Sequence, residues 1–571
     1  MSHQPHRGSR DRSNVYINCP PSAAHDFSYQ RSTATPIVAD RVSLPAVAGT
    51  VDLLSVLPPD MAARYASDFS IIPTEAKNIR RPCFHGSADE YVRLIRRLRA
   101  AGMVDFTTSP RAVNGLFGVP KDGGQIRLII DARPANVRFP VPETVKLPTP
   151  DVMANVRARN GRRFYVAKSD VSDFYHRLRL PLWMAPFFAL PSLRAADVGP
   201  DVASRFGDDC PVHPMCLTLP MGWSHSVLVA QAAHEWLLSR IQGFNSCDRI
   251  SGDPDFDPVL GPDRVLFGVY IDDLTLVSES AGAVDVLQER YVSYMDGVGL
   301  TTKDSKRVRA SSTGVESVGL LIHGEAHTIG VAPAKLWHLI GDTRDTIRRG
   351  RLSGLDASLL VGKWSWAALV SRFALSIFSS VYRFIDFATH KWDPKSDMRW
   401  RSFKMWPSVR MELETMIAIA PLLVADMSAP YFPLALASDA SETGLGLSVA
   451  PLLGSLPQTV SGMQWRSVIS APWRRDCCEH INALELRASH AGVRWVLSHP
   501  NSIGHRVLFW VDSTVVLGIL RKGRSSAPRL LRRVRGVAAL VLAAGLVLDT
   551  GWVPSELNPA DAGSRAFDVR A

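Results

Sequence analysis

Two aspartates, Asp272 and Asp273, stand side by side between the apolar segments VLFGV and LTLVS. Such segments predict two β-strands joined by a tight turn, which would expose both carboxylates at one strand end. A third acid, Asp170, ends another apolar segment, FYVAKSD. Adjacent carboxylates repel one another, and divalent cations relieve the repulsion. Acids from the two strand ends can hold two Mg²⁺ ions roughly 3.5–4 Å apart, which activates an attacking 3′-hydroxyl and stabilises a leaving pyrophosphate.

Residues 431–571 carry a second set of acids. Asp439 ends an apolar strand, Glu485 lies in an amphipathic helical segment, and Asp512 ends the strand VLFWV. Asp561 follows in the segment WVPSELNPADAGSR. A fold that gathers these four carboxylates can bind two Mg²⁺ ions and hydrolyse a phosphodiester through an activated water. Taken singly, each acid has the alternative interpretation of a cap or a surface residue.

Six motifs follow one another between about residues 80 and 330. They are Lys121, Arg127–Arg133 (RLIIDAR), Asp170–Tyr175 (DVSDFY), Leu219–Ser226 (LPMGWSHS), Tyr270–Asp273 (YIDD) and Gly299–Lys306 (GLTTKDSK). In kind and in order, this series resembles the reverse transcriptases of retroviruses and LTR-type retroelements. The resemblance implies an RNA-directed and DNA-directed DNA polymerase whose partners are an RNA template, a DNA primer and dNTPs.

The same resemblance assigns the catalytic residues of the polymerase. It makes Asp170, Asp272 and Asp273 the metal-binding triad, with two Mg²⁺ ions per active site and Mn²⁺ as a substitute. Lys306 matches a late lysine that donates a proton to the leaving pyrophosphate.

Four residues match positions that contact the incoming nucleotide. Lys121 and Arg127 match contacts to the triphosphate oxygens, and Asp173 lies where the backbone runs beneath the triphosphate. Tyr175 matches the side chain under the sugar, where a bulky ring would clash with a ribose 2′-hydroxyl. The resemblance therefore implies that the substrate is a dNTP.

Gly222 and Gln231 match the segment that packs against the templating base pair. Met221 stands where many relatives have Gln, so this chain departs from the family at a fine contact to the incoming nucleotide. The departure does not touch the residues that carry the chemistry.

The four acids of residues 431–571 resemble, in spacing and order, the RNase H domain attached to retroelement reverse transcriptases. Two segments, INALELRA and WVPSELNPADAGSR, are most similar to DIRS-type retrotransposons. The resemblance implies that Asp439, Glu485, Asp512 and Asp561 are catalytic metal ligands that hydrolyse the RNA strand of RNA–DNA hybrids. The alternative is a catalytically decayed or domesticated retroelement remnant that only binds nucleic acid, and the presence of all seven acids favours activity.

The elements that position these residues fall into four predicted regions. Residues 1–75 lack periodicity and are predicted to be a loosely structured extension. Residues 76–330 would form the fingers and palm, 331–430 a helical thumb and connection, and 431–571 an RNase H-like domain. The fold class is therefore an α+β right-hand polymerase followed by an α/β domain. Stretches 193–213 and 244–263, rich in Gly, Pro and Asp, are predicted to be surface loops.

Two further patterns each have a purely structural and a functional interpretation. The run Arg521–Arg535 contains seven Lys or Arg residues and no acid, so it predicts either a solvated helix face or a grip on hybrid phosphates. Trp364, Trp366, Phe373 and Phe378 stand at near-helical spacing, which favours the core of the thumb or connection over a base-stacking platform.

Composition and charge restrict the kind of partner and the cellular compartment that can be expected. The 571 residues include 65 Lys and Arg against 54 Asp and Glu, giving a net charge of +11 and a pI near 9.4, which suits a polyanionic partner. The seven cysteines form no CxxC pair, which favours a reducing intracellular compartment, cytoplasmic or nuclear. The longest apolar run, 536–548, is too short for a membrane span, so no membrane partner is expected. The oligomeric state is left open.

Overall fold

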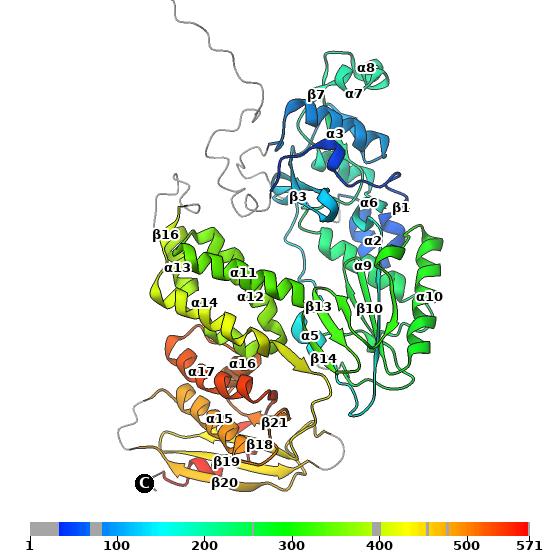
Figure 1. Ribbon diagram of the computed structural model, residues 1–571. Coiled ribbons are helices and arrows are strands. Elements are labelled where there is room, and N and C mark those ends of the chain that lie inside the picture. Colours follow the sequence, from blue (N-terminus) through cyan, green and yellow to red (C-terminus); the bar gives the residue numbers. More distant parts are fainter. Residues whose placement is uncertain are drawn as a thin grey trace, which may run out of the picture.

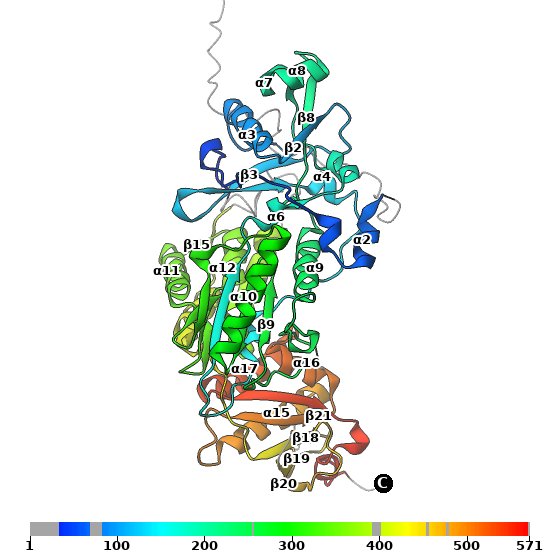
Figure 2. The same cartoon turned by 90° about the vertical axis from the view of Figure 1, so that its right-hand side faces the viewer.

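The computed structural model describes residues 34–68, 83–253, 256–390, 401–452, 456–474 and 479–568 (Figure 1). Its described elements stack from top to bottom in three groups, which a view turned by 90° separates clearly (Figure 2). The upper group carries α3 (Ala88–Ala100) and β3 (Gly115–Pro120), and the lowest carries β18 (Leu434–Ala440).

The sheet of the middle group positions the first set of acids. It has four antiparallel strands in the order β11-β5-β10-β9, with β5 spanning Tyr165–Asp170, β9 Leu266–Tyr270, β10 Asp273–Ser278 and β11 Val308–Ser311. Helix α10 (Ala281–Val298) packs against β5 and β10, and α9 (Ser226–Leu238) lies beside β9. The predicted hairpin around Asp272 is confirmed by the antiparallel pairing of β9 with β10.

The upper group contains a hairpin of β3 and β4 (Ile126–Asp131), joined through the short segment Asp122–Gly124. A second sheet has the order β2-β8-β7, formed by Val104–Thr107, Pro211–Cys216 and Leu193–Arg194. The stretch 193–213 was predicted to be a surface loop, and this prediction is wrong. It contains β7, α7 (Ala195–Val198), α8 (Pro200–Phe206) and the start of β8, because Ala195, Val198 and Val202 are buried together.

The N-terminal prediction also needs correction. Residues 34–68 contain β1 (Val51–Asp52) and α2 (Pro59–Ala66), and Leu53 and Tyr65 are fully buried. The Tyr65 hydroxyl lies 2.8 Å from His225 Nδ1, so this segment is part of the core. Its apolar residues make long-range contacts without a local period, which is why the pattern failed to reveal them. Residues 1–33 and 69–75 of the predicted extension lie outside the described residues.

Residues 315–426 form a small sheet and a group of helices. The sheet has the order β12-β13-β14-β17, with bounds Val315–Ser317, Leu320–His323, Thr328–Val331 and Val424–Asp426. The helices are α11 (Pro333–Arg349), α12 (Gly354–Ala368), α13 (Ser380–His390) and α14 (Pro407–Ile419), with the 3₁₀ segment η8 (Leu369–Ile377) after α12. Trp364 is fully buried and Phe378 is buried in the same apolar cluster, as the core interpretation predicted, whereas the buried Phe373 packs with apolar residues of the lowest group.

The lowest group is a five-stranded sheet in the order β20-β19-β18-β21-β22. Strands β18, β19 (Gly444–Pro451) and β20 (Arg466–Pro472) are antiparallel, whereas β21 (Arg506–Val511) and β22 (Val547–Trp552) run parallel to β18. Helices α15 (Ile481–Leu497), α16 (Thr514–Lys522) and α17 (Pro528–Ala543) follow the strands, and the short α18 (Asp561–Ser564) packs on β19 and β20. This is the strand–helix alternation predicted for residues 431–571.

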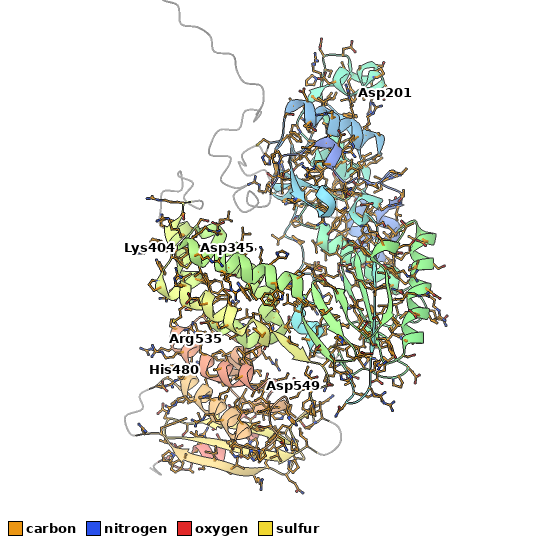
Figure 3. The ribbon with its side chains drawn as sticks, in the orientation of Figure 1. Asp201, Asp345, Lys404, His480, Arg535 and Asp549 are labelled. Carbon is orange, nitrogen blue, oxygen red and sulfur yellow. The ribbon has the colours of Figure 1, made fainter. Side chains whose placement is uncertain are left out.

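The basic run lies where the lowest group meets the helices above it. Arg535, which belongs to α17, is labelled in Figure 3, and its guanidinium donates to the carbonyls of Ser376 and Ile377 at 2.9 and 2.7 Å. Gly523 packs so closely on η8 that an added Cβ would lie 2.2 Å from the Arg372 carbonyl oxygen. Much of this run therefore joins two parts of the chain, which neither sequence interpretation anticipated.

No single described helix is both long and apolar enough to cross a membrane, although the bent pair formed by Gly354–Ile377 and Ser380–Thr389 meets that criterion by length and composition.

Candidate active sites

The turn between β9 and β10 brings the first three acids together. Asp273 pairs with Asp170 across the ladder of β10 and β5, and the backbone N–H of Val171 donates to the Asp272 carbonyl at 3.0 Å. The turn residue Ile271 has a φ of +59°, a left-handed conformation that β-branched residues rarely adopt. The local fold therefore presents three carboxylates from two strand ends at one place.

The pKa values of Asp272 and Asp273 are raised. Burial, followed by the neighbouring Asp273 and Asp170, raises the pKa of Asp272 to about 6. Burial also raises the pKa of Asp273, although Lys168, with its Nζ 3.5 Å from Asp273 Oδ1, opposes the shift. Asp170 is flanked by Lys303, whose Nζ lies 3.2 Å from Oδ1, and by Lys306, whose Nζ lies 3.0 Å from Oδ2.

The donor set has the chemistry of a divalent-metal site, although these three acids do not all bring an oxygen within 4.8 Å of one another. Asp170 Oδ1 and Asp273 Oδ1 are buried oxygens that accept no hydrogen bond within the described residues, and each faces a lysine ammonium, at 3.2 and 3.5 Å, so each keeps lone pairs that a divalent cation could take. Burial, and after it the charges of Asp273 and Asp170, disfavours the charged form of Asp272 and raises its pKa, and a bound cation would oppose that effect. Lys303 and Lys306 supply part of this compensation from the protein itself.

A cleft of about 1040 Å³ opens over these carboxylates. That volume matches the largest small-molecule sites and accommodates a nucleoside triphosphate. The predicted residues that line it are Lys121, Arg127, Asp170, Asp173, Tyr175, Gly222, Asp272, Asp273 and Lys306. Lysines and an arginine around an acidic floor complement a polyphosphate that arrives with its metal ions.

The lysines at the cleft lie close enough for the charge of one to lower the pKa of another. The Lys121 ammonium donates to Ser43 Oγ at 2.8 Å, and its pKa is lowered by burial and then by Lys303. Asp173, at φ +48°, begins the short helix α6 (Phe174–Arg177) and partly offsets that lowering. A triphosphate placed here would meet positive charge that the protein has already concentrated.

Sequence reasoning missed one wall of the cleft. The turn between β12 and β13, at Val318 and Gly319, lines it together with Lys335 and Trp366. Lys335 Nζ lies 2.7 Å from Glu316, and a Cβ on Gly319 would approach the Trp366 ring to 3.0 Å. Trp366 was grouped with the core aromatics because its spacing matched theirs, and only the tertiary fold places it in the cleft.

Gln231 does not line the cleft, which corrects its predicted place against a base pair. Its buried side chain accepts from the N–H of Ile271 at 2.8 Å and donates to the Val269 carbonyl at 2.9 Å. The amide lies beneath the β9–β10 turn and satisfies backbone groups that the tight hairpin leaves without partners. Gln231 is therefore a brace for the turn, and no motif match could reveal that direction.

The backbone conformation and the close packing at position 222 require glycine. It has a φ of +130°, and an added Cβ would lie 1.9 Å from the Ile130 carbonyl oxygen of β4. The turn is tied to that strand by a hydrogen bond from the Ile130 N–H to the Met221 carbonyl at 2.9 Å. A side chain at 222 would therefore push the turn away from β4.

We expect Gly222→Ala to destabilise the protein by about 2–4 kcal/mol, because the change adds both left-handed strain and a clash with rigid backbone. The measurement is the midpoint of urea unfolding. Gly282→Ala is the matched control, since a Cβ at that helical position meets nothing within 4 Å. Equal midpoints for the two variants would show that the turn at 222 adapts without cost.

The second set of acids also converges. Asp439 of β18, Glu485 of α15 and Asp512 after β21 each offer an oxygen, and these oxygens lie within 4.8 Å of one another. Burial, with Asp512 and Asp439 adding to it, raises the pKa of Glu485 to about 9. Burial likewise raises the pKa of Asp439 to about 6. Asp512 Oδ1 is buried without a hydrogen bond, so this cluster also fits a divalent cation.

Asp561 lies near this cluster but outside the set of three. Its carboxylate accepts from Arg565 Nε at 2.7 Å, and its charge contributes to the raised pKa of Asp439. Ser564, on the same short helix, donates to Asp439 Oδ2. The helix α18 therefore brings one further acid and one hydroxyl to the edge of the cluster.

The predicted phosphate grip of the basic run applies to only part of it. Arg533 pairs with Glu479, and Arg535 faces Glu412 at 3.4 Å, so both are engaged within the protein. Arg529 and Arg532 are exposed on α17 and remain candidates for a polyanion contact. The partners Glu412 and Glu479 are distant in sequence, which is why the run looked unpaired.

Comparisons with known proteins find similarity to solved structures and to no family model or curated sequence. A foamy viral protease-reverse transcriptase dRH in complex with double-stranded DNA has 12% identity and a TM-score of 0.44, covering 96% of this chain and 84% of that one. The foamy viral protease-reverse transcriptase with an RNA/DNA hybrid has 13% identity and a TM-score of 0.44, over 86% and 57% of the chains. The same viral protein with double-stranded DNA has 14% identity and a TM-score of 0.44, over 88% and 95%.

Proposed function

We propose that this chain is an RNA-directed and DNA-directed DNA polymerase of a retrotransposon. The observation that carries the proposal is the meeting of Asp170, Asp272 and Asp273 at two strand ends beneath a cleft lined with lysines. Its partners would be an RNA template, a DNA primer, an RNA–DNA hybrid and dNTPs, and its place of action the cytoplasm or nucleus. The sheet of β5, β9, β10 and β11 would be the palm, the upper group the fingers, and α11–α14 the thumb and connection.

Mg²⁺, with Mn²⁺ as a substitute, would supply the Lewis acidity that activates a 3′-hydroxyl and stabilises a leaving pyrophosphate. Asp170, Asp272 and Asp273 would hold it. Lys121, Arg127 and Lys306 all line the cleft. Lys121 and Arg127 would bind triphosphate oxygens, and Lys306 would protonate the leaving group. These residues orient the reactants, which is most of what the protein contributes to phosphoryl transfer.

We further propose that residues 431–571 form an RNase H-like domain that cleaves the RNA strand of the hybrid. The convergence of Asp439, Glu485 and Asp512 supports this function, because three close carboxylates can hold the metal ions that activate a water. Asp561, at the edge of the cluster, would complete the set. The rival proposal, a decayed remnant that only binds nucleic acid, predicts binding without either reaction.

The direct test of the polymerase function is extension of an oligo(dT) primer on poly(rA). With dTTP and Mg²⁺ the full chain should extend the primer, and a chelator should stop the reaction. Retarded migration of the primer–template in a gel without any extension, in Mg²⁺ or in Mn²⁺, would favour the nucleic-acid-binding remnant.

Tyr175 should set the choice between deoxyribose and ribose. Its half-buried ring lines the cleft, where burial, followed by the charge of the neighbouring Asp272, raises the pKa of its hydroxyl. We expect Tyr175→Val to weaken discrimination against ribonucleotides by about a hundredfold, because a smaller side chain leaves room for the 2′-hydroxyl. The measurement is the ratio of kcat/KM for dTTP and UTP.

Tyr175→Phe is the matched control for this prediction, because it keeps the ring and removes only the hydroxyl. It should discriminate as the unmodified chain does. If Tyr175→Val discriminates equally well, another residue excludes the ribose.

A further inference from the structure

A buried chain of hydrogen bonds leads from α10 to the turn that carries Asp272. His234 of α9 is fully buried, with Nδ1 2.8 Å from the Ile271 carbonyl oxygen and Nε2 3.0 Å from the Tyr291 hydroxyl. Tyr291 of α10 is also fully buried, and its ring stacks on the imidazole with the centroids 5.7 Å apart. Neither side chain lines the cleft.

The contacts fix the direction of each hydrogen bond. A carbonyl oxygen only accepts, so His234 Nδ1 must carry the proton that it donates to Ile271. Nε2 is then the lone-pair nitrogen and accepts from the Tyr291 hydroxyl. Burial lowers the pKa of His234 to about 4, so the ring is neutral at cellular pH and can serve both partners.

The turn has physical reasons to need this support. Ile271 is β-branched and left-handed at φ +59°, which costs about 1–3 kcal/mol. The three carboxylates gathered beside it also carry like charges, which disfavour their close approach. The N–H of Ile271 is held by Gln231 and its carbonyl by His234, so two side chains of α9 bind both polar backbone atoms of the strained residue.

We propose that His234 and Tyr291 are positioning residues of the polymerase site, which hold the Ile271 peptide so that Asp272 and Asp273 stay at the strand end beside Asp170. The inference deepens the proposed polymerase function and rests on it for the identity of the site. The hydrogen-bond chain would limit the cost of gathering the carboxylates before the metal arrives. Partners of this kind, one step behind the ligands, typically change metal affinity by about 10–100-fold when removed.

The test compares substitutions that keep or lose the donor to Ile271. An Asn amide occupies nearly the place of histidine Nδ1, whereas a Gln amide reaches toward the place of Nε2. His234→Asn should therefore retain the donor, and His234→Gln should lose it. Tyr291→Phe removes only the hydroxyl and frees the imidazole to adopt the other tautomer. Tyr294→Phe, on the same helix, is the matched control.

The readout is Mn²⁺ affinity, measured by the loss of the free-ion paramagnetic signal during titration of the full chain. All variants would carry Glu485→Gln, which weakens the second acid cluster so that binding reports the first. We expect His234→Gln and Tyr291→Phe to raise the Mn²⁺ dissociation constant about tenfold, with His234→Asn and Tyr294→Phe within about twofold of the parent. Thermal unfolding of each variant accompanies the titration.

Equal Mn²⁺ affinity in all variants would overturn the proposal. It would also be overturned if His234→Asn lost as much affinity as His234→Gln, because the ring would then matter only for packing. If the expected affinity pattern appears but the parent chain extends no primer on RNA or DNA, the positioning role stands and the polymerase function fails. The two proposals therefore fail by different results.

Discussion

Asp272→Asn should abolish DNA synthesis while leaving hybrid binding largely intact. The amide keeps the shape of the side chain but removes a charged ligand from the cluster of Asp170, Asp272 and Asp273. Metal stabilisation of the transition state is worth several kcal/mol, so extension should fall by roughly a thousandfold or more. The measurement is primer extension on poly(rA) at saturating dTTP, with hybrid binding followed by fluorescence anisotropy.

The control for this variant is Asp296→Asn, an exposed aspartate near the end of α10 that does not line the cleft. It should extend primers at the parental rate. Extension by Asp272→Asn within tenfold of the parent would remove Asp272 from the catalytic set. Loss of hybrid binding together with extension would mean that the substitution disturbs the fold of the cleft.

Glu485→Gln should stop cleavage of the RNA strand of a hybrid while primer extension continues near the parental rate. The two acid sets belong to different sheets, so each should hold its metal ions with its own carboxylates. One lost ligand among close carboxylates should lower cleavage by about two to three orders of magnitude. The measurement uses one preparation and a hybrid labelled on the RNA strand.

The linkage between the protonation of Glu485 and folding stability argues against a folding defect as the cause of that loss. Burial raises the folded-state pKa of Glu485 to about 9, above its ordinary value near 4.5, so the carboxyl costs the metal-free protein stability as pH rises through this window. Replacing it with an amide removes that cost at neutral pH. Glu556→Gln, an exposed acid in the segment after β22, is the matched control. Normal cleavage by Glu485→Gln would end the nuclease proposal for this domain, and loss of both reactions would contradict the division into two sites.

Local patterns predicted the parts of the sites that depend on short segments. The turn at Asp272 and the strand before Asp512 follow from short continuous apolar runs that end in an acid, and the structure confirms both elements. The convergence of Asp439, Glu485 and Asp512 required a topology in which β21 lies parallel beside β18. Spacing alone could not supply that adjacency, and the resemblance to RNase H domains did.

The errors share one physical cause, which is that long-range contacts decide a side chain's direction. Gln231 points under the turn because the backbone of Ile271 needs an acceptor there. Arg533 and Arg535, although partly exposed, pair with acids more than fifty residues away in the chain. Tyr65 is buried although the apolar residues around it in the sequence show no helical or strand periodicity, because its hydroxyl forms a hydrogen bond with His225. None of these partners can be read from a local window.

The proposed function is that one chain copies RNA into DNA and cleaves the copied RNA at separate metal sites. Its most direct test is a single reaction on a DNA primer annealed to a longer RNA template, with different labels on the two strands. With dNTPs and Mg²⁺, the primer should lengthen and the RNA should shorten, Asp272→Asn should lose only the first change, and Glu485→Gln only the second. A chain that binds this substrate and alters neither strand, or whose two reactions vanish together in either variant, would contradict the account.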